Sequence, residues 1–139
     1  MSVQVLVDTG PLVAMVSRRD QHHRICVRQL GELAAPLLTC WPVLTEAVWL
    51  LRRYPEGIER LLGSFEAGLL KLLPLGEEAM PWIRQFLRRY RKQGAQLADA
   101  TLVYLAEREG IDTVFTLDRR DFSIYRLAAG RHVHVVPAR

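Results

Sequence analysis

The sequence predicts an α/β fold in which helices cover both faces of a mainly parallel sheet. Two observations lead to this prediction. Short apolar runs of strand length alternate along the chain with longer stretches of helical periodicity. In addition, no internal repeat, low-complexity tract or linker interrupts the alternation, so residues 1–139 are expected to form a single domain.

Short apolar runs between Pro and Gly residues predict the strands. In chain order the expected strands cover residues 3–7, 36–40, 69–73, 113–117 and 132–136. The first run, Val-Gln-Val-Leu-Val, is β-branched and typical of a strand buried on both faces. Pro74 ends the third run, and His and Val alternate in the last, as they would along a strand.

Helical periodicity predicts the elements between the strands. In chain order the expected helices cover residues 10–16, 22–33, 42–53, 56–67, 77–90 and 96–109. Pro42 suits the first turn of its helix, and Gly110 suits the C-cap of the last one. The helix over residues 77–90 places Trp82 and Phe86 inward and arginines outward. In such a fold, ligands bind beyond the C-terminal ends of the strands.

The composition is that of an ordinary globular protein. Of 139 residues, 50% are hydrophobic and 24% are charged, and no apolar run approaches the ~20 residues that cross a bilayer. Residues 1–8 lack the basic start of a signal peptide and are interpreted as a core strand. Cys26 and Cys40 have no CxxC spacing and are expected to be buried, reduced thiols, which suits a cytoplasmic protein. The net charge of +4 permits a polyanionic partner such as RNA.

Two aspartates stand where expected strands end. Asp8 follows the first strand directly, and Asp118 follows the strand over residues 113–117. Both carboxylates would project into the crevice above the sheet. Each also has a structural alternative, because an aspartate at this place can cap the next helix. Asp121, three residues further on, is interpreted as a helix cap, an additional ligand, or a residue that supports the ligands.

Two further acids lie on expected helix faces that are otherwise apolar. Helical spacing places Glu46 with Val43 and Ala47, and it places Asp99 with Leu102. A charged group on such a face is costly unless it has a partner. The structural alternatives are a salt bridge from Glu46 to an arginine and a favourable helix-dipole position for Asp99.

A single metal site accounts for all four acids, Asp8, Glu46, Asp99 and Asp118. Neighbouring carboxylates repel one another without a cation, and hard oxygen ligands suit Mg²⁺ or Mn²⁺ better than zinc. A divalent ion can lower the pKa of a bound water and neutralise charge on a phosphoryl group. The hypothesis is therefore a catalytic site that hydrolyses a phosphodiester.

The chain resembles the PIN-domain family, and within it the VapC-like toxins of bacterial toxin–antitoxin pairs. The resemblance covers essentially the whole chain and rests on segments that occur in the family's order. These segments are Val7-Asp8-Thr9-Gly10-Pro11-Leu12-Val13-Ala14, Thr45-Glu46, Leu97-Ala98-Asp99-Ala100 and Phe115-Thr116-Leu117-Asp118-Arg119-Arg120-Asp121-Phe122. Each segment is short, but the ordered set is specific.

The resemblance implies a three-layer α/β/α sandwich with a five-stranded sheet in the order 3-2-1-4-5. It implies that Asp8, Glu46, Asp99 and Asp118 bind Mg²⁺ or Mn²⁺ and activate water against RNA. It assigns Thr9 and Thr116 to hydroxyl positions beside the site. The implied protein is a metal-dependent endoribonuclease with an antitoxin partner and a homodimeric assembly. In such proteins the helices around residues 49–62 contact these partners; the alternative is that the large apolar residues of these helices simply pack in the core.

Several interpretations stay open at this point. The arginine-rich face of the helix over residues 77–90, extended by Lys92, can track RNA phosphates or simply face solvent. His22 and His23 are interpreted as surface or capping residues rather than catalytic ones. An RNA-processing nuclease outside a toxin–antitoxin pair and a non-catalytic RNA-binding module are the alternative functions. A haloacid-dehalogenase-like phosphatase is disfavoured, because it needs an acid where Gly10 stands.

Overall fold

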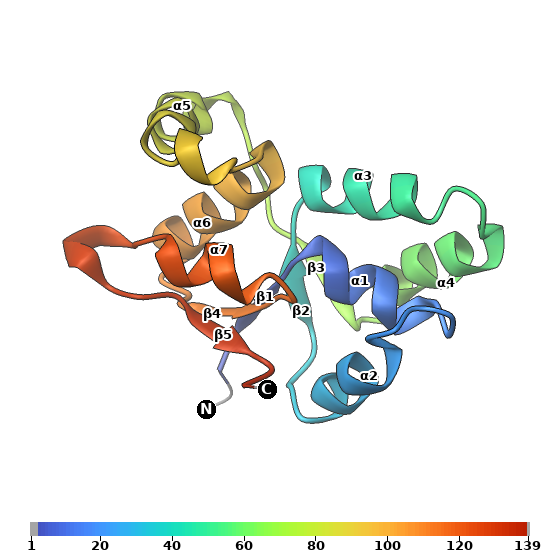
Figure 1. Ribbon diagram of the computed structural model, residues 1–139. Coiled ribbons are helices and arrows are strands. Elements are labelled where there is room, and N and C mark those ends of the chain that lie inside the picture. Colours follow the sequence, from blue (N-terminus) through green and yellow to red (C-terminus); the bar gives the residue numbers. More distant parts are fainter. Residues whose placement is uncertain (1–2, 139) are drawn as a thin grey trace.

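The computed structural model describes residues 3–138. Within that range, five parallel strands form one sheet in the order β3-β2-β1-β4-β5 (Figure 1). The strands are β1 (Val5–Val7), β2 (Leu37–Thr39), β3 (Leu70–Leu72), β4 (Thr113–Phe115) and β5 (His134–Val136). The expected strand order is therefore confirmed, and β1 lies at the centre.

The inner strands are apolar because helices cover both faces of the sheet. Every residue of β1, β2 and β4 is buried, whereas the outer strands β3 and β5 are partly exposed. The register pairs Leu6 of β1 with Leu38 on one side and with Val114 on the other. This burial on both faces is the pattern of a three-layer α/β/α sandwich.

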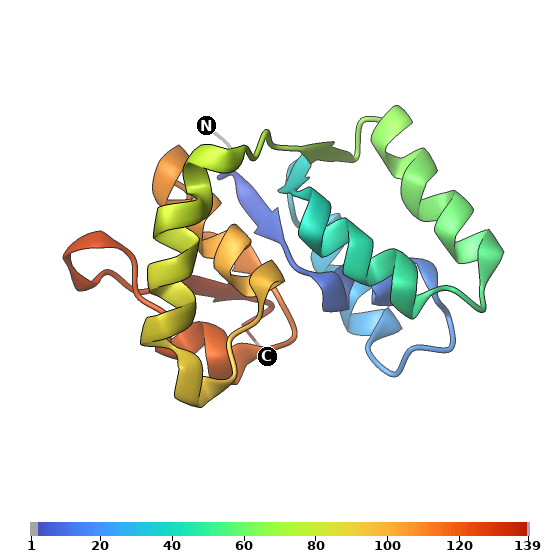
Figure 2. The same ribbon diagram turned by 90° about the horizontal axis from the view of Figure 1, so that it is seen from above.

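The helices separate into two groups along the sheet. They are α1 (Thr9–Val16), α2 (His23–Gly31), α3 (Trp41–Leu50), α4 (Pro55–Glu66), α5 (Met80–Arg89), α6 (Leu97–Glu109) and α7 (Arg119–Ile124). In Figures 1 and 2, α1 to α4 gather around the half with β2 and β3, and α5 to α7 gather around the half with β4 and β5. Helices α3 and α6 contact each other, so the two groups meet beside the central strand.

Two elements differ from the expectation. The expected helix over residues 77–90 begins as a 3₁₀ turn, Glu77–Ala79, and becomes α-helical only from Met80. Pro81 explains the change, because it has no N–H to donate to the carbonyl four residues earlier. Helix α7 was not predicted, since its six residues are too few to show a period. Within residues 3–138, no helix has the length and apolar character to span a bilayer.

Candidate active site

The two aspartates at strand ends lie at the same edge of the sheet. Asp8 follows β1 directly, and its backbone N–H donates to the carbonyl of Phe115, the last residue of β4, over 2.9 Å. Asp118 comes three residues after that strand ends. Because β1 and β4 are adjacent and parallel, their C-terminal ends bring the two acids to one place, as the sequence predicted.

The two acids on helices reach the same place from above the sheet. Glu46 lies in α3 and Asp99 in the first turn of α6, and these helices contact each other. All four acids line one cleft of about 480 Å³. The full lining consists of Asp8, Thr9, Gly10, Glu46, Leu50, Gly94, Gln96, Asp99, Leu117, Asp118 and Asp121. Asp121, to which the sequence assigned several possible roles, is therefore part of the cleft.

The Thr116 hydroxyl joins two of the acids. It donates to Asp8 Oδ2 over 2.7 Å and accepts from the backbone N–H of Asp118 over 3.0 Å. Thr116 is fully buried, so this geometry is fixed by the surrounding core. The Thr9 hydroxyl donates to the Val43 carbonyl of α3 over 3.4 Å and so links the start of α1 to the helix that carries Glu46.

Tyr125 is a site residue that the sequence did not indicate. Its hydroxyl donates to Asp99 Oδ2 over 2.6 Å, and its ring packs against Phe122 and Tyr90. The residue is buried, so the hydroxyl is aimed by the packing of its ring. A tyrosine that follows the motif by three residues carries no local signal of this role, because the contact spans 26 residues of sequence.

The structural alternatives account for only part of the cluster. Within residues 3–138, the Asp8 side chain makes no capping hydrogen bond to α1, and none of the salt bridges involves Glu46. Asp118 does cap a helix, since its Oδ1 accepts from the backbone N–H of Asp121 over 3.1 Å. Capping is therefore confirmed for Asp118 alone of the strand-end acids, and Asp99 does occupy the first turn of α6 as its helix-dipole alternative required. The alternatives proposed for Asp8 and Glu46 are not observed.

Burial and mutual repulsion raise the pKa values of these carboxyl groups. Burial is the largest cause at Asp8, whose pKa rises to about 7; the charges of Asp99 and Glu46 add to this, and the Thr116 hydrogen bond opposes it. The pKa of Asp99 is raised by burial and by Asp118, against the Tyr125 hydrogen bond. Burial, and then the charge of Asp99, raise the pKa of Glu46. The negative charges of these carboxylates are therefore not balanced by positive charge within the cluster.

The pKa of Asp121 follows the same logic at the rim of the cleft. It is raised by burial, by its contact with Asp118 and by the charge of Asp99, while Arg120 opposes the shift. No Lys, Arg or His is among the described residues that line the cleft. Excess negative charge gathered without a basic partner is the condition that a bound cation relieves.

The donor chemistry of the cleft fits a hard divalent cation. Carboxylate oxygens with hydroxyls nearby are the ligands of Mg²⁺ and Mn²⁺, and a site of this kind commonly retains water ligands. In the part of the chain that the structure describes, no three His, Cys, Asp or Glu side chains already converge as a ligand set. The acids therefore surround a space rather than close on a point.

The histidines and cysteines lie outside this cleft. His23 Nδ1 lies 2.6 Å from the carbonyl of Ala14, and the backbone N–H of His22 donates to Asp20. Cys26 and Cys40 are free, buried thiols, as expected, and burial is the main cause that raises the pKa of each. These residues support the helices around the sheet and do not contribute donors to the acidic cleft.

Comparison with known proteins identifies the family. Residues 5–129 match the model of the PIN domain. Ribonuclease VapC26 of Mycobacterium tuberculosis is 26% identical over 136 residues, which cover 96% of this chain and 100% of that protein.

Solved structures share the fold at lower identity. VapC20 of Mycobacterium tuberculosis, a sarcin–ricin loop cleaving toxin, gives a TM-score of 0.69 at 18% identity over 80% of this chain and 87% of that chain. The DNA-bound VapBC of Salmonella typhimurium gives a TM-score of 0.61 at 18% identity over 96% and 98%. The family match spans most of the sequence and includes the whole acidic cleft, so the chain belongs to the PIN-domain family.

Proposed function

We propose that this protein is a divalent-metal-dependent endoribonuclease whose site is the cleft formed by Asp8, Glu46, Asp99 and Asp118. The observation that carries the proposal is the gathering of these four carboxylates around a space with no basic lining residue among those described, together with the raised pKa values of Asp8, Glu46 and Asp99. Such a cluster is costly for a fold unless it holds a cation that the function requires.

The chain's own residues prepare the cleft for this chemistry. The four acids would hold Mg²⁺ or Mn²⁺, and Asp121 would support them from the rim. When bound, the ion supplies positive charge for the phosphodiester oxygens and lowers the pKa of a water. Thr116 fixes one oxygen of Asp8, and Tyr125 fixes one oxygen of Asp99, so that the ionised carboxylates keep one orientation. A carboxylate that is held in one orientation, is partly buried and has a pKa near neutral pH can also accept the proton of the attacking water.

RNA is the substrate that the available observations favour. The relative VapC26 is named a ribonuclease, and the structural neighbour VapC20 cleaves the sarcin–ricin loop. The outer face of α5 and the turn after it expose several cations that suit a phosphate backbone. These exposed residues are Arg84, Arg88, Arg89, Arg91 and Lys92.

We further propose that the protein acts as the toxin of a toxin–antitoxin pair and forms a homodimer. The neighbour VapBC is a complex of this kind, bound to DNA. Helices α3 and α4 expose Trp41, Trp49, Leu50 and Leu62, of which Trp41 is 63% exposed. Exposed large apolar side chains of this type are favourable to cover with a partner. An RNA-processing role outside a toxin–antitoxin pair remains the alternative function.

RNA cleavage with metal added back tests the enzymatic proposal. Purified protein stripped of metal is incubated with structured RNA with and without Mg²⁺ or Mn²⁺, beside the variants Asp8→Asn and Asp99→Asn. Asp112→Asn is the matched control, because Asp112 is exposed and precedes β4 at the opposite edge of the sheet. We expect metal-dependent cleavage by the wild type and the control only. Equal cleavage by all variants would reveal a contaminating nuclease and contradict the proposal.

Expression in a bacterial host separates the toxin from the processing enzyme. A toxin is expected to arrest growth, and co-expression of the protein encoded beside it is expected to restore growth and to yield a copurifying complex. Normal growth with an active nuclease would instead favour the processing role. Light scattering of the purified protein measures its mass in solution, and a monomer would contradict the homodimer.

A further inference from the structure

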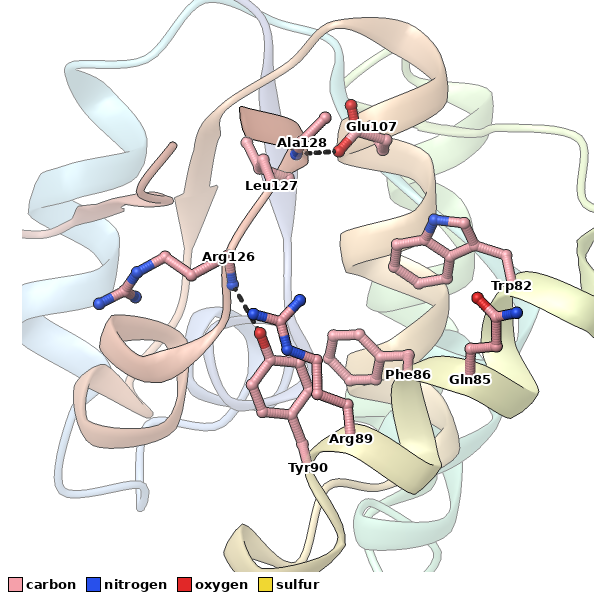
Figure 3. Close-up of a pocket in the computed structure, with 9 residues that line it drawn as sticks. All are labelled: Trp82, Gln85, Phe86, Arg89, Tyr90, Glu107, Arg126, Leu127 and Ala128. Atoms are coloured by element: carbon pink, nitrogen blue, oxygen red, sulfur yellow. Dashed lines mark hydrogen bonds between the residues drawn. The ribbon is translucent and has the colours of Figure 1, made fainter. Parts of the chain in front are cut away.

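A second concave site lies beside α5 and shares no lining residue with the acidic cleft. It has a volume of about 340 Å³ and is enclosed by α5, by Glu107 of α6 and by the segment from Arg126 to Ala128 (Figure 3). Trp82 and Phe86 of α5, and Tyr90 directly after it, form an aromatic wall. We call this site the aromatic pocket.

The rings of the wall contact one another in sequence. The ring centroids of Trp82 and Phe86 lie 5.4 Å apart in a stacked arrangement, and those of Phe86 and Tyr90 lie 4.7 Å apart. Trp82 also packs edge-on against Tyr104, with ring centroids 5.5 Å apart, but it is only partly buried, and part of its indole lines the pocket. A partly exposed indole held in place by aromatic neighbours offers part of its ring to a second planar group.

A positive charge stands at the edge of the pocket. The guanidinium of Arg89 lies 5.2 Å from the ring centroid of Tyr90, and the residue is exposed. None of the ion pairs within residues 3–138 involves Arg89. The acid of the pocket, Glu107, is already engaged, because it accepts from the backbone N–H of Ala128 over 2.5 Å and pairs with Arg131 over 3.6 Å. The cation is therefore available to a ligand.

The aromatic pocket is connected to the acidic cleft in two ways. Tyr90, which ends its wall, packs edge-on against Tyr125 with centroids 5.0 Å apart, and Tyr125 holds Asp99 of the cleft. The chain also runs from Tyr90 through the exposed residues Arg91–Gln93 to Gly94, which lines the cleft. A phosphate backbone that follows this basic segment leads from one site to the other.

We propose that the aromatic pocket binds an unpaired nucleobase of the RNA, flanking the bond that the cleft hydrolyses, and that Arg89 binds an adjacent phosphate. The inference rests on the proposed ribonuclease function. A planar base stacked on Trp82, beside a cation, is the usual way in which proteins hold single-stranded RNA. The preferred substrate is then a loop or single strand, because a base within a duplex cannot reach the indole.

Binding is measured without cleavage, in EDTA. The sequence contains three tryptophans, and Trp41 and Trp49 are exposed on α3. Their replacement by Phe leaves Trp82 as the only indole, so its fluorescence reports on the aromatic pocket. Titration with a short unstructured RNA should quench this signal. The same oligonucleotide with abasic sites should bind about tenfold more weakly, and so should unmodified RNA with a Trp82→Leu variant of the otherwise wild-type chain, measured by RNA anisotropy.

The contact between the Arg89 charge and an RNA phosphate is tested separately. Arg89→Gln should lower the slope of log K against log salt by about 0.7, the value for one phosphate contact on a single strand. Arg28→Gln is the matched control, since Arg28 is exposed on α2. Circular dichroism verifies that each variant is folded, and Arg89 is replaceable without loss of core packing because it is exposed.

The outcomes separate the two proposals. Cleavage by the wild type together with unchanged binding in Trp82→Leu and Arg89→Gln would overturn the pocket while leaving the ribonuclease intact. Equal affinity for abasic and complete RNA would also overturn it. Quenching that depends on bases and on Arg89, without any metal-dependent cleavage, would support the pocket as an RNA site and contradict the enzymatic proposal instead.

Discussion

Replacement of Thr116 by Val tests whether the hydroxyl stabilises the ionised form of Asp8. Val has almost the shape of Thr, so the fully buried side chain keeps its packing but loses both hydrogen bonds of its hydroxyl. The bond accepted from the backbone N–H of Asp118 does not depend on the charge of Asp8, so its loss is the same at every pH. The lost bond, 2.7 Å to Asp8 Oδ2, contributes about 2 kcal/mol when the acceptor is ionised and about 1 kcal/mol when it is neutral. Because the pKa of Asp8 is about 7, the two states can be compared by a change of pH.

The direction in which the cost of Thr116→Val changes with pH follows from the linkage between protonation and folding. The substitution raises the folded-state pKa of Asp8 further, by roughly one unit, and leaves the unfolded value unchanged. The extra loss of stability is therefore absent well below pH 7 and complete above about pH 8. We expect Thr116→Val to cost about 1 kcal/mol more at about pH 8.5 than at about pH 5.

Urea denaturation of the metal-free protein at both pH values measures this difference. Thr113→Val is the matched control, since Thr113 is a buried threonine in β4, the strand that Thr116 follows, and its hydroxyl contacts Asp112 outside the cleft. The control should cost the same at both pH values. An equal cost of Thr116→Val at both values, or an equal pH dependence in the control, would refute the role assigned to the hydroxyl.

Three further outcomes follow from the same site. The metal-free wild type should lose stability as pH rises from about 4 to about 7, because the folded-state pKa of Asp8 is raised; the loss is on the order of 4 kcal/mol, and Asp8→Asn should remove most of it. Mg²⁺ or Mn²⁺ at about a hundred times its Kd should stabilise the wild type by about 2.7 kcal/mol in thermal unfolding, and an unchanged Tm would contradict a metal site. Tyr125→Phe should move the acidic limb of the pH–rate profile to higher pH, because it removes the hydrogen bond that lowers the pKa of Asp99. A profile identical to that of the wild type would show that this hydrogen bond is only structural.

The order and type of most elements could be predicted because their signals are local. A β-branched run such as residues 3–7 and a Pro at the start of a helix are visible within a few residues. Strand ends were less predictable, since β1 pairs only over Val5–Val7 and the limits depend on the neighbouring strands. Helix α7 was missed because it is short and follows a capping Asp118 whose role is set by the fold.

The candidate site could be predicted at positions where a charged side chain stands among apolar ones. Glu46 and Asp99 stood out as acids on apolar helix faces, and the structure brings them to the same cleft. Tyr125 could not be predicted in this way, because a buried tyrosine has an ordinary place in a core. The aromatic pocket was missed for a similar reason: Trp82 was expected to point into the core, whereas the distant segment Arg126–Ala128 encloses the concave site beside it.

Calorimetric titration of Mn²⁺ into metal-free protein tests the central proposal most directly. If the four acids form one metal site, the wild type and Asp112→Asn should bind Mn²⁺ with equal affinity, and Asp8→Asn, Glu46→Gln and Asp99→Asn should each weaken binding strongly. The affinity of the wild type should also increase as pH rises through about 7, because the metal competes with the proton on Asp8. Binding that is unchanged in all three variants would contradict the account.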